Sequence, residues 1–218
     1  MKRPAVCFFD VDHTITRGST GRHFAFKAVR AGYIHASALL SIPLFYFKYR
    51  LGLVRDDDLV GEFSILKGIP RKELEDLGHK TFRQKIVGDI YPQAGELIQS
   101  LRDEGSEIVI ATSSLDLVVE PLADHLGIDT VLASSLEYSD GKCTGRFEGK
   151  LYFGENKKTE ALEYLRSRKI DPGDCAFYSD SIHDLPLLEC VGLPVAVNPD
   201  VRLTRHASEK GWEIIRFR

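Results

Sequence analysis

The chain has 218 residues, of which 43% are hydrophobic and 28% are charged, a balance typical of one soluble domain with an insertion or of two small domains. A chain of this length buries roughly 70% of the surface that it exposes when unfolded, so it needs no disulfide to fold. The formal net charge of −3 argues against nucleic acid as a partner, because such proteins carry a basic surface.

The cysteines and the N-terminal residues bear on the cellular compartment. The four cysteines include no CxxC pair and no spacing typical of a secreted, disulfide-rich domain. Residues 1–4 lead directly into an apolar run and lack the long apolar segment of a signal peptide. We therefore expect a cytoplasmic location.

The first predicted element is a buried strand over residues 5–9, AVCFF, followed at once by Asp10 and Asp12. One aspartate would be enough to end a strand in a turn. Two carboxylates at positions two residues apart, followed by Thr14 in the motif DVDHT, therefore indicate a chemical role at the end of this strand.

Residues 16–89 follow a helical pattern, with a predicted helix start at the acidic run 56–58. Their most apolar part, 31–47, contains Ser37, Ser41 and a proline, and it is shorter than a comfortable membrane span. We interpret it as a buried or pocket-lining helix. The alternative is an interfacial helix that contacts a membrane surface and is anchored by the basic residues that follow it.

From residue 91 onward, predicted helices and strands alternate. The strands cover 107–111, 130–133, 174–179, 194–197 and 212–217, and the helices cover 94–102, 115–126, 156–168 and 184–191. Asp140-Gly141 predicts a hairpin turn. This alternation predicts an α/β fold with a Rossmann-like parallel sheet. We expect a discontinuous core, 1–15 and 91–218, and a helical cap over 16–90 inserted into it.

Ligands of such sheets bind where the carboxyl ends of the parallel strands meet. Seven residues would meet there: Asp10, Asp12, Thr112, Ser113, Ser114, Asp180 and Asp184. Two lysines, Lys157 and Lys158, stand at the start of the next helix, where anions are favoured. Clustered carboxylates need a cation, and hydroxyls with a lysine suit a phosphate, so the pattern predicts Mg²⁺ and a phosphate group. An aspartate can also act as the nucleophile in such a site.

In this order the motifs resemble those of the haloacid dehalogenase superfamily of phosphohydrolases. DVDHT is similar to its first motif, DxDxT, and IVIATSS, ENKKTEAL and YSDSIHDLPLL supply the hydroxyl, the lysine and the acidic motif. The resemblance covers essentially the whole chain. The hairpin region ASSLEYSDGKCTGRFEGK is similar to that of phosphoserine phosphatase-like members, which carry a helical cap between the first two motifs.

The resemblance implies the roles of the aspartates. Asp10 would attack phosphorus and become an aspartyl-phosphate, and Asp12 would act as general acid and base. Mg²⁺ would be held by the Asp10 and Asp180 carboxylates and by the Asp12 backbone carbonyl, and Asp184 would hold a metal-bound water.

The resemblance also implies that Thr112 and Lys158 bind the phosphoryl oxygens. Ser113 and Lys157 are the alternatives at these two positions. His13 and His183 border the expected site, and we interpret both as solvated or supporting residues.

The substrate is expected to be a small phosphate ester. Phosphoserine phosphatases hold the substrate ammonium with a glutamate where an alignment puts Ser19, and its carboxylate with an arginine where Glu62 falls. A glutamate would repel a carboxylate, so we expect an amino-alcohol phosphate such as histidinol phosphate, with its amine facing Glu62. The alternatives are phosphoserine, a lipid-linked phosphate such as phosphatidylglycerophosphate, transfer to an alcohol, and a non-catalytic sensor of phosphometabolites.

Overall fold

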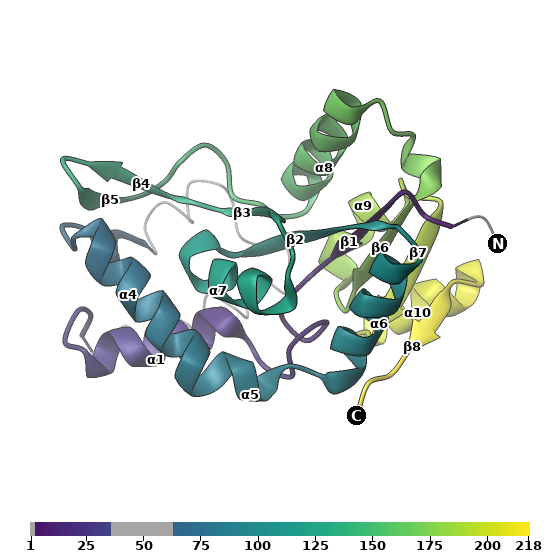
Figure 1. Cartoon of the computed structure of the whole chain (residues 1–218). Helices are drawn as coiled ribbons and strands as arrows, with labels where there is room; N and C mark the ends of the chain where they lie inside the picture. Colours follow the sequence, from purple (N-terminus) through teal and green to yellow (C-terminus); the bar gives the residue numbers. More distant parts are fainter. Residues whose placement is uncertain (1–2, 36–62) are drawn as a thin grey trace.

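The computed structural model describes residues 3–35 and 63–218, and its centre is a six-stranded sheet in the order β3-β2-β1-β6-β7-β8 (Figure 1). The strands are β1 Val6–Phe9, β2 Glu107–Leu115, β3 Thr130–Ser134, β6 Cys175–Ser179, β7 Leu193–Val197 and β8 Glu213–Ile215. All neighbouring pairs in this sheet are parallel. The predicted α/β, Rossmann-like fold is confirmed.

Five helices cover the two faces of the sheet: α6 Pro92–Asp103, α7 Asp116–Leu126, α8 Glu155–Arg168, α9 Leu185–Leu188 and α10 Val201–Lys210. Successive β1 side chains point to opposite faces. Cys7 and Phe9 belong to the apolar cluster that includes α6 and α7, whereas Val6 and Phe8 belong to the cluster formed with α8, α9 and α10. Both faces of β1 are therefore buried, and only its carboxyl end is available to a ligand.

Two elements at the carboxyl edge of the sheet differ in extent from the prediction; elsewhere, β8 is shorter than the predicted strand 212–217, and α10 was not predicted. Strand β2 continues past Ala111 to Leu115, with a shift in its register against β3 between these two residues. The predicted helix over 184–191 is only α9, since Asp184 belongs to a separate 3₁₀ turn, Ile182–Asp184, and the helix ends at Leu188. Both differences fall at the carboxyl edge of the sheet, where the chain leaves regular geometry.

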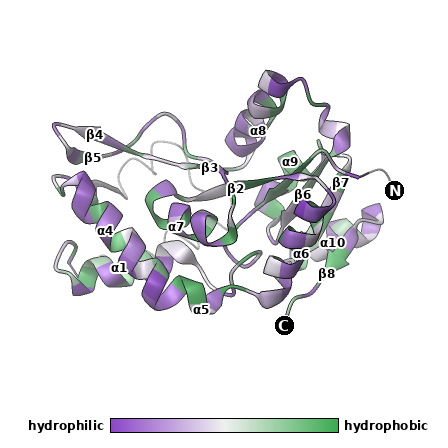
Figure 2. Ribbon diagram, in the orientation of Figure 1, coloured by the Kyte–Doolittle hydropathy of each residue, from purple (hydrophilic) through white to green (hydrophobic). Residues whose placement is uncertain are grey.

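Residues 16–90, called the insertion below, contribute α1 Thr20–Arg30, a 3₁₀ turn Phe63–Leu66, α4 Arg71–Thr81, a π-helical turn Phe82–Ile86 and α5 Val87–Asp89. Figure 2 shows both hydrophilic and hydrophobic colouring on α1 and α4, as expected for helices with one buried face.

The chain leaves and re-enters the core at one place. Thr16 forms an antiparallel bridge with Ile90, and the Tyr91 amide donates a hydrogen bond to the Ile15 carbonyl at 2.9 Å. The Arg17 amide donates to the Asp89 carbonyl at 2.8 Å. These two paired segments, 15–17 and 89–91, are called the neck below.

Helix α4 of the insertion packs closely on α7 of the core. A Cβ atom at Gly78 would lie 2.0 Å from the Leu117 carbonyl oxygen, so only glycine allows this approach. Burial of Leu74 and Leu77 on the same helix completes the contact.

The hairpin of β4 Leu136–Ser139 and β5 Lys142–Phe147 also joins the insertion. The Gly68 amide donates to the Cys143 carbonyl at 2.8 Å, and the Cys143 amide donates to the Ile69 carbonyl at 2.9 Å. Its turn is the predicted one, with φ of 49° at Asp140 and 72° at Gly141. The insertion is thus attached to the core at the neck, at α7 and at this hairpin.

Several predictions fall outside the described residues, namely Glu62, the acidic run 56–58 and most of the apolar segment 31–47. In the described ranges, no helix is both long enough and apolar enough to cross a bilayer. All four cysteines lie in those ranges, and each is a free thiol.

Candidate active site

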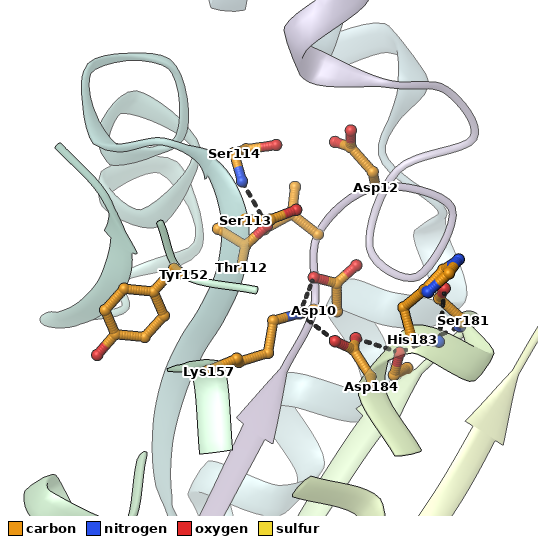
Figure 3. Close-up of polar contacts among 12 residues, drawn as sticks. Asp10, Asp12, Thr112, Ser113, Ser114, Tyr152, Lys157, Ser181, His183 and Asp184 are labelled. Carbon is orange, nitrogen blue, oxygen red and sulfur yellow. Dashed lines mark hydrogen bonds and ion pairs between the residues drawn. The ribbon is translucent and has the colours of Figure 1, made fainter. Parts of the chain in front are cut away.

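The chain turns sharply directly after β1. The Val11 carbonyl accepts hydrogen bonds from the amides of Thr14, Ile15 and Thr16 at 3.2, 2.9 and 3.0 Å, and His13 adopts a left-handed φ of 61°. This turn ends the strand alternation. Figure 3 shows the result, with the carboxylates of Asp10 and Asp12 at one end of β1, beside the Thr112–Ser114 run of β2.

Asp10 belongs to a buried group of charges. Lys157 Nζ lies 3.0 Å from Asp10 Oδ1 and 2.7 Å from Asp184 Oδ1, and Ser179 Oγ donates to Asp184 Oδ2 at 2.6 Å. Asp10 is 6% exposed, Lys157 2% and Asp184 3%. These four residues, called the Lys157 cluster, hold each other in place, because a buried charge is tolerated only when it is paired and hydrogen-bonded.

The structure corrects the predicted lysine. Lys158 pairs with Glu155 at 3.2 Å, and its side chain is 31% exposed, whereas the Lys157 side chain is 3% exposed and contacts Asp10. Adjacent helical residues point about 100° apart, so only one of the two can face the sheet. The sequence did contain a signal for Lys157, because it shares the spacing of four with Ala161 and Leu165, which are both buried on the core side of α8.

Burial shifts the pKa values of the charged groups. It raises the pKa of Asp10 from 3.8 to about 7; Lys157 opposes this shift, and the charges of Asp184 and Asp12 add to it. Burial also raises the pKa of Asp180 well above its ordinary value, and the neighbouring carboxylates add to that effect. Burial alone would lower the pKa of Lys157, but Asp10 and Asp184 outweigh it and raise that pKa. The site therefore brings together more carboxyl groups than one ammonium group can neutralise, and without a further positive charge their ionised forms are disfavoured.

A divalent cation fits this excess of carboxyl groups. The predicted donors are the carboxylates of Asp10 and Asp180 and the backbone carbonyl of Asp12, all hard oxygen atoms of the kind that Mg²⁺ prefers. Among residues 3–35 and 63–218, no three His, Cys, Asp or Glu side chains form a group that could hold a metal by themselves. A set of two carboxylates completed by a carbonyl and water is compatible with that finding, because Mg²⁺ usually keeps several waters.

The loop that carries Asp180 is held from β7 and α10. The Asp200 amide donates to the Asp180 carbonyl at 2.8 Å, and the Asp200 carboxylate accepts from the amides of Ile182 and Leu203 at 3.0 and 2.8 Å. Ser179 Oγ accepts from the Ser181 amide at 3.2 Å. These contacts fix the backbone of Asp180 beside β1.

Asp12 lies in a different environment. Its Oδ1 accepts two hydrogen bonds from Thr20, one from the backbone N at 2.9 Å and one from Oγ1 at 2.7 Å. Thr20 Oγ1 also lies 2.9 Å from Ser114 Oγ. Neither the bond from Thr20 to Asp12 nor the contact between Thr20 and Ser114 was predicted from the sequence; the available signal was a hydroxyl residue at a helix start closely following DVDHT.

The hydroxyl run of β2 is buried and cross-linked. Thr112 is buried, and its Oγ1 accepts from the Ser114 amide at 3.3 Å. The Ser113 carbonyl accepts from Ser134 Oγ at 3.1 Å, and Ser134 Oγ accepts from the Tyr152 amide at 3.0 Å. The run therefore connects to the segment that leads into α8 and Lys157, and the choice between Thr112 and Ser113 as phosphate ligand stays a prediction.

The two histidines that border the site make local contacts. His13 Nδ1 lies 3.1 Å from the Arg17 carbonyl oxygen, so the ring braces the turn after β1. The His183 ring packs on Phe153, with ring centroids 5.4 Å apart. These contacts agree with supporting positions at the rim of the site.

Comparisons with known proteins agree with this geometry. A histidinol-phosphatase of Neisseria meningitidis is 31% identical over 225 residues, which cover 100% of both chains. A phosphoserine phosphatase of Mycobacterium tuberculosis is 32% identical over 98% of this chain and 71% of its own. A crystal structure of a protein of unknown function from Bordetella pertussis superposes with a TM-score of 0.86 at 28% identity, covering 96% of this chain and 97% of that one. The pattern of one family matches residues 7–189, and this chain belongs to that family, the haloacid dehalogenase-like hydrolases.

Proposed function

We propose that this protein is a Mg²⁺-dependent phosphomonoesterase that works through an aspartyl-phosphate on Asp10. The observation that carries the proposal is the position of Asp10: it is buried at the tip of β1, paired with Lys157 and followed by Asp12 on the same turn. A carboxylate held in this way is aligned to attack phosphorus, and the adjacent lysine offsets the charge of the phosphoryl oxygens.

Two proton transfers at Asp12 complete the reaction. Asp12 donates a proton to the ester oxygen as the P–O bond to the alcohol breaks and the bond between Asp10 and phosphorus forms. It then takes a proton from the water that attacks phosphorus and releases Asp10. Thr112 and Lys157 bind the phosphoryl oxygens throughout. Asp184 orients Lys157, and Ser179 orients Asp184.

Mg²⁺, held by Asp10, Asp180 and the Asp12 carbonyl, would supply positive charge to the phosphoryl group. Asp184 is proposed to hold a metal-bound water and not the metal itself. It can do so while it contacts Lys157 and Ser179, because a carboxylate has about four acceptor sites.

We propose an amino-alcohol phosphate, with histidinol phosphate as the first candidate, as the substrate. It is supported by the neisserial relative, which matches this chain over the full length of both. The position expected to bind the ammonium group of phosphoserine holds Ser19, a neutral residue whose hydroxyl instead accepts from the Arg22 amide at 3.3 Å. In this proposal the insertion serves as the cap that selects the substrate, and Glu62 faces the amine.

The test is phosphate release from histidinol phosphate, phosphoserine, phosphoethanolamine, nucleoside monophosphates and a lipid phosphate, with and without Mg²⁺. Asp10→Asn is the matched control, because it removes the nucleophile and keeps the size of the side chain. Turnover that needs both Mg²⁺ and Asp10 supports the mechanism, and a preference for histidinol phosphate supports the substrate. A preference for phosphoserine contradicts the substrate proposal, and turnover that survives Asp10→Asn contradicts the mechanism.

A further inference from the structure

The carboxylate of Asp12 is held by the insertion and not by the core elements that hold Asp10. Thr20, which supplies both hydrogen bonds to Asp12 Oδ1, is the first residue of α1 and is 1% exposed. Its hydroxyl also contacts Ser114 on β2. A line of three polar side chains thus runs from β2 through the start of the insertion to Asp12.

The direction of the hydrogen bonds along this line follows from the number of protons. Asp12 Oδ1 accepts a hydrogen bond from the Thr20 backbone N–H, and the single hydroxyl proton of Thr20 points to the same oxygen. Ser114 Oγ must then donate its own proton to Thr20 Oγ1, since that oxygen has no proton left to give. Ser114 therefore fixes the hydroxyl rotor of Thr20, and Thr20 fixes the orientation of the Asp12 carboxylate.

This arrangement leaves one oxygen of Asp12 for chemistry. With Oδ1 occupied by two donors from Thr20, the proton that is given to the ester oxygen and later taken from water is carried by Oδ2. We propose that Thr20, oriented by Ser114, is the positioning residue for the acid–base work of Asp12. This inference rests on the proposed phosphatase mechanism and adds to it Thr20, a residue outside the family motifs identified in the sequence, and a role for Ser114, the last residue of IVIATSS.

Substrates with different leaving groups can distinguish a positioning role of Thr20 from a purely structural one. An alkyl alkoxide is strongly basic and needs the proton from Asp12, whereas 4-nitrophenolate departs with little help from an acid. The ratio kcat/KM covers only the steps up to departure of the leaving group. Misplacing Asp12 should therefore lower kcat/KM for an alkyl phosphate much more than for 4-nitrophenyl phosphate.

The experiment measures kcat/KM with Mg²⁺ for 4-nitrophenyl phosphate and for the alkyl phosphate that the wild type hydrolyses fastest. Thr20→Val should lower the alkyl value about 10- to 100-fold, a part of the 10²- to 10⁴-fold that general acid catalysis contributes, and the nitrophenyl value less than about 3-fold. Thr20→Ser should restore the alkyl value, and Ser114→Ala should show a smaller loss with the same dependence on the leaving group.

Two controls accompany these variants. Thr81→Val makes the same change at another fully buried threonine of the insertion, whose hydroxyl donates to the Leu77 carbonyl of its own helix, and it should not distinguish the two substrates. In an Asp12→Asn background, Thr20→Val should cause no further loss on the alkyl phosphate, because the group that it positions is already gone.

The outcomes are distinct. An equal loss on both substrates, no loss on either, or an additive loss in the Asp12→Asn background overturns the inference while the phosphatase proposal stands. If Thr20→Val does not fold, the ratio of the two substrates for Ser114→Ala decides. A folded wild type that hydrolyses neither substrate overturns the phosphatase proposal, and the inference falls with it.

Discussion

The two aspartates of the first motif lie two residues apart but are held by different parts of the molecule. Asp10 is fixed by charge, through Lys157 from α8, in a cluster built entirely from the core. Asp12 is fixed by the neutral Thr20 hydroxyl and an amide at the start of the insertion. In the proposed mechanism, the nucleophile Asp10 therefore depends on the buried electrostatics of the core, and the acid–base residue Asp12 depends on how the insertion is seated.

The strongest test of this comparison removes the charge on the core side. Lys157→Met should lower the free energy of unfolding by about 3–5 kcal/mol, because it leaves Asp10 and Asp184 as uncompensated buried charges. Turnover should fall at least about 100-fold, as for other donors to developing charge. Chemical denaturation and phosphate release measure the two effects. Lys158→Met is the neighbouring control and should change either quantity little; an equal loss from both variants would contradict the assignment of Lys157.

Mg²⁺ should stabilise the core side, and more strongly at higher pH. In the metal-free protein, the raised pKa of Asp10 means that the folded chain binds more protons than the unfolded one between about pH 4 and pH 7. The free energy of unfolding therefore falls as pH rises through this window. A bound cation favours the ionised carboxylates and removes that loss of stability. At a Mg²⁺ concentration one hundred times its Kd, the free energy of unfolding should rise by about 2.7 kcal/mol.

Thermal unfolding with and without Mg²⁺ at about pH 5.5 and about pH 8 measures this difference. The increase in Tm caused by Mg²⁺ should be larger at the higher pH. It should shrink in Asp180→Asn, which lacks one of the proposed donors. An increase that is independent of pH, or unaffected by Asp180→Asn, would rule out these carboxylates as the binding site.

On the insertion side, Gly78→Ala should disturb the seating of α4 on α7. The added methyl would lie 2.0 Å from the Leu117 carbonyl oxygen, so the helices must move apart, at a cost of about 1–3 kcal/mol. Gly88→Ala in α5 is the matched control, because nothing lies within 4 Å of its added Cβ.

Denaturation curves of the two glycine variants measure their free energies of unfolding. The ratio kcat/KM then tests whether the insertion side and the core side of the site act separately. If the insertion positions Asp12, Gly78→Ala should lower kcat/KM for an alkyl phosphate by a larger factor than it lowers the affinity of the protein for Mg²⁺. The Mg²⁺ affinity should change less because the core supplies the proposed metal donors. Equal changes in both quantities would mean that the two sides are not separate.

The smallest effect is expected at Ser134, which joins the Ser113 carbonyl to the Tyr152 amide. Ser134→Ala should cost about 1 kcal/mol for the hydrogen bonds that it loses, with a few-fold decrease in turnover. Ser208→Ala, which removes an exposed hydroxyl from α10, should fall within about 0.5 kcal/mol of the wild type. A Ser134→Ala protein as stable and active as the Ser208→Ala control would show that this link does not support the site.

The sheet could be predicted because each strand that is covered on both faces is a short, nearly continuous apolar run. AVCFF and EIVIA have this form, and both lie in adjacent parallel strands, with Phe9 opposite Ile110. The positions of Asp10 and Asp180 at its carboxyl edge followed from the same rule. Their side-chain partners did not, because a partner depends on which way a neighbouring element is rotated.

Lys157 lies at that limit, because its spacing of four with Ala161 and Leu165 indicates the buried side of α8 but does not show that this side faces Asp10. The choice between two adjacent lysines depends on the rotation of α8, which is set at its first residues after Gly154, where φ is 51°. The bond between Thr20 and Asp12 depends on the turn at His13 between β1 and α1, and no periodic pattern encodes that turn. The pairing of Cys143 with Ile69 joins distant segments, so it has no local signal at all.

The neck between Thr16 and Ile90 has a consequence for how such proteins diversify. The chain departs from β1 and returns to α6 through two paired segments, about 5 Å apart as in any strand pair. A segment of another length or shape that begins and ends in the same pair could be exchanged at this point without changing the register of the sheet. If the insertion selects the substrate, as proposed, selectivity for the alcohol part can then change as one heritable block while Asp10 is transmitted unaltered, provided that the new segment again supplies hydrogen bonds to Asp12.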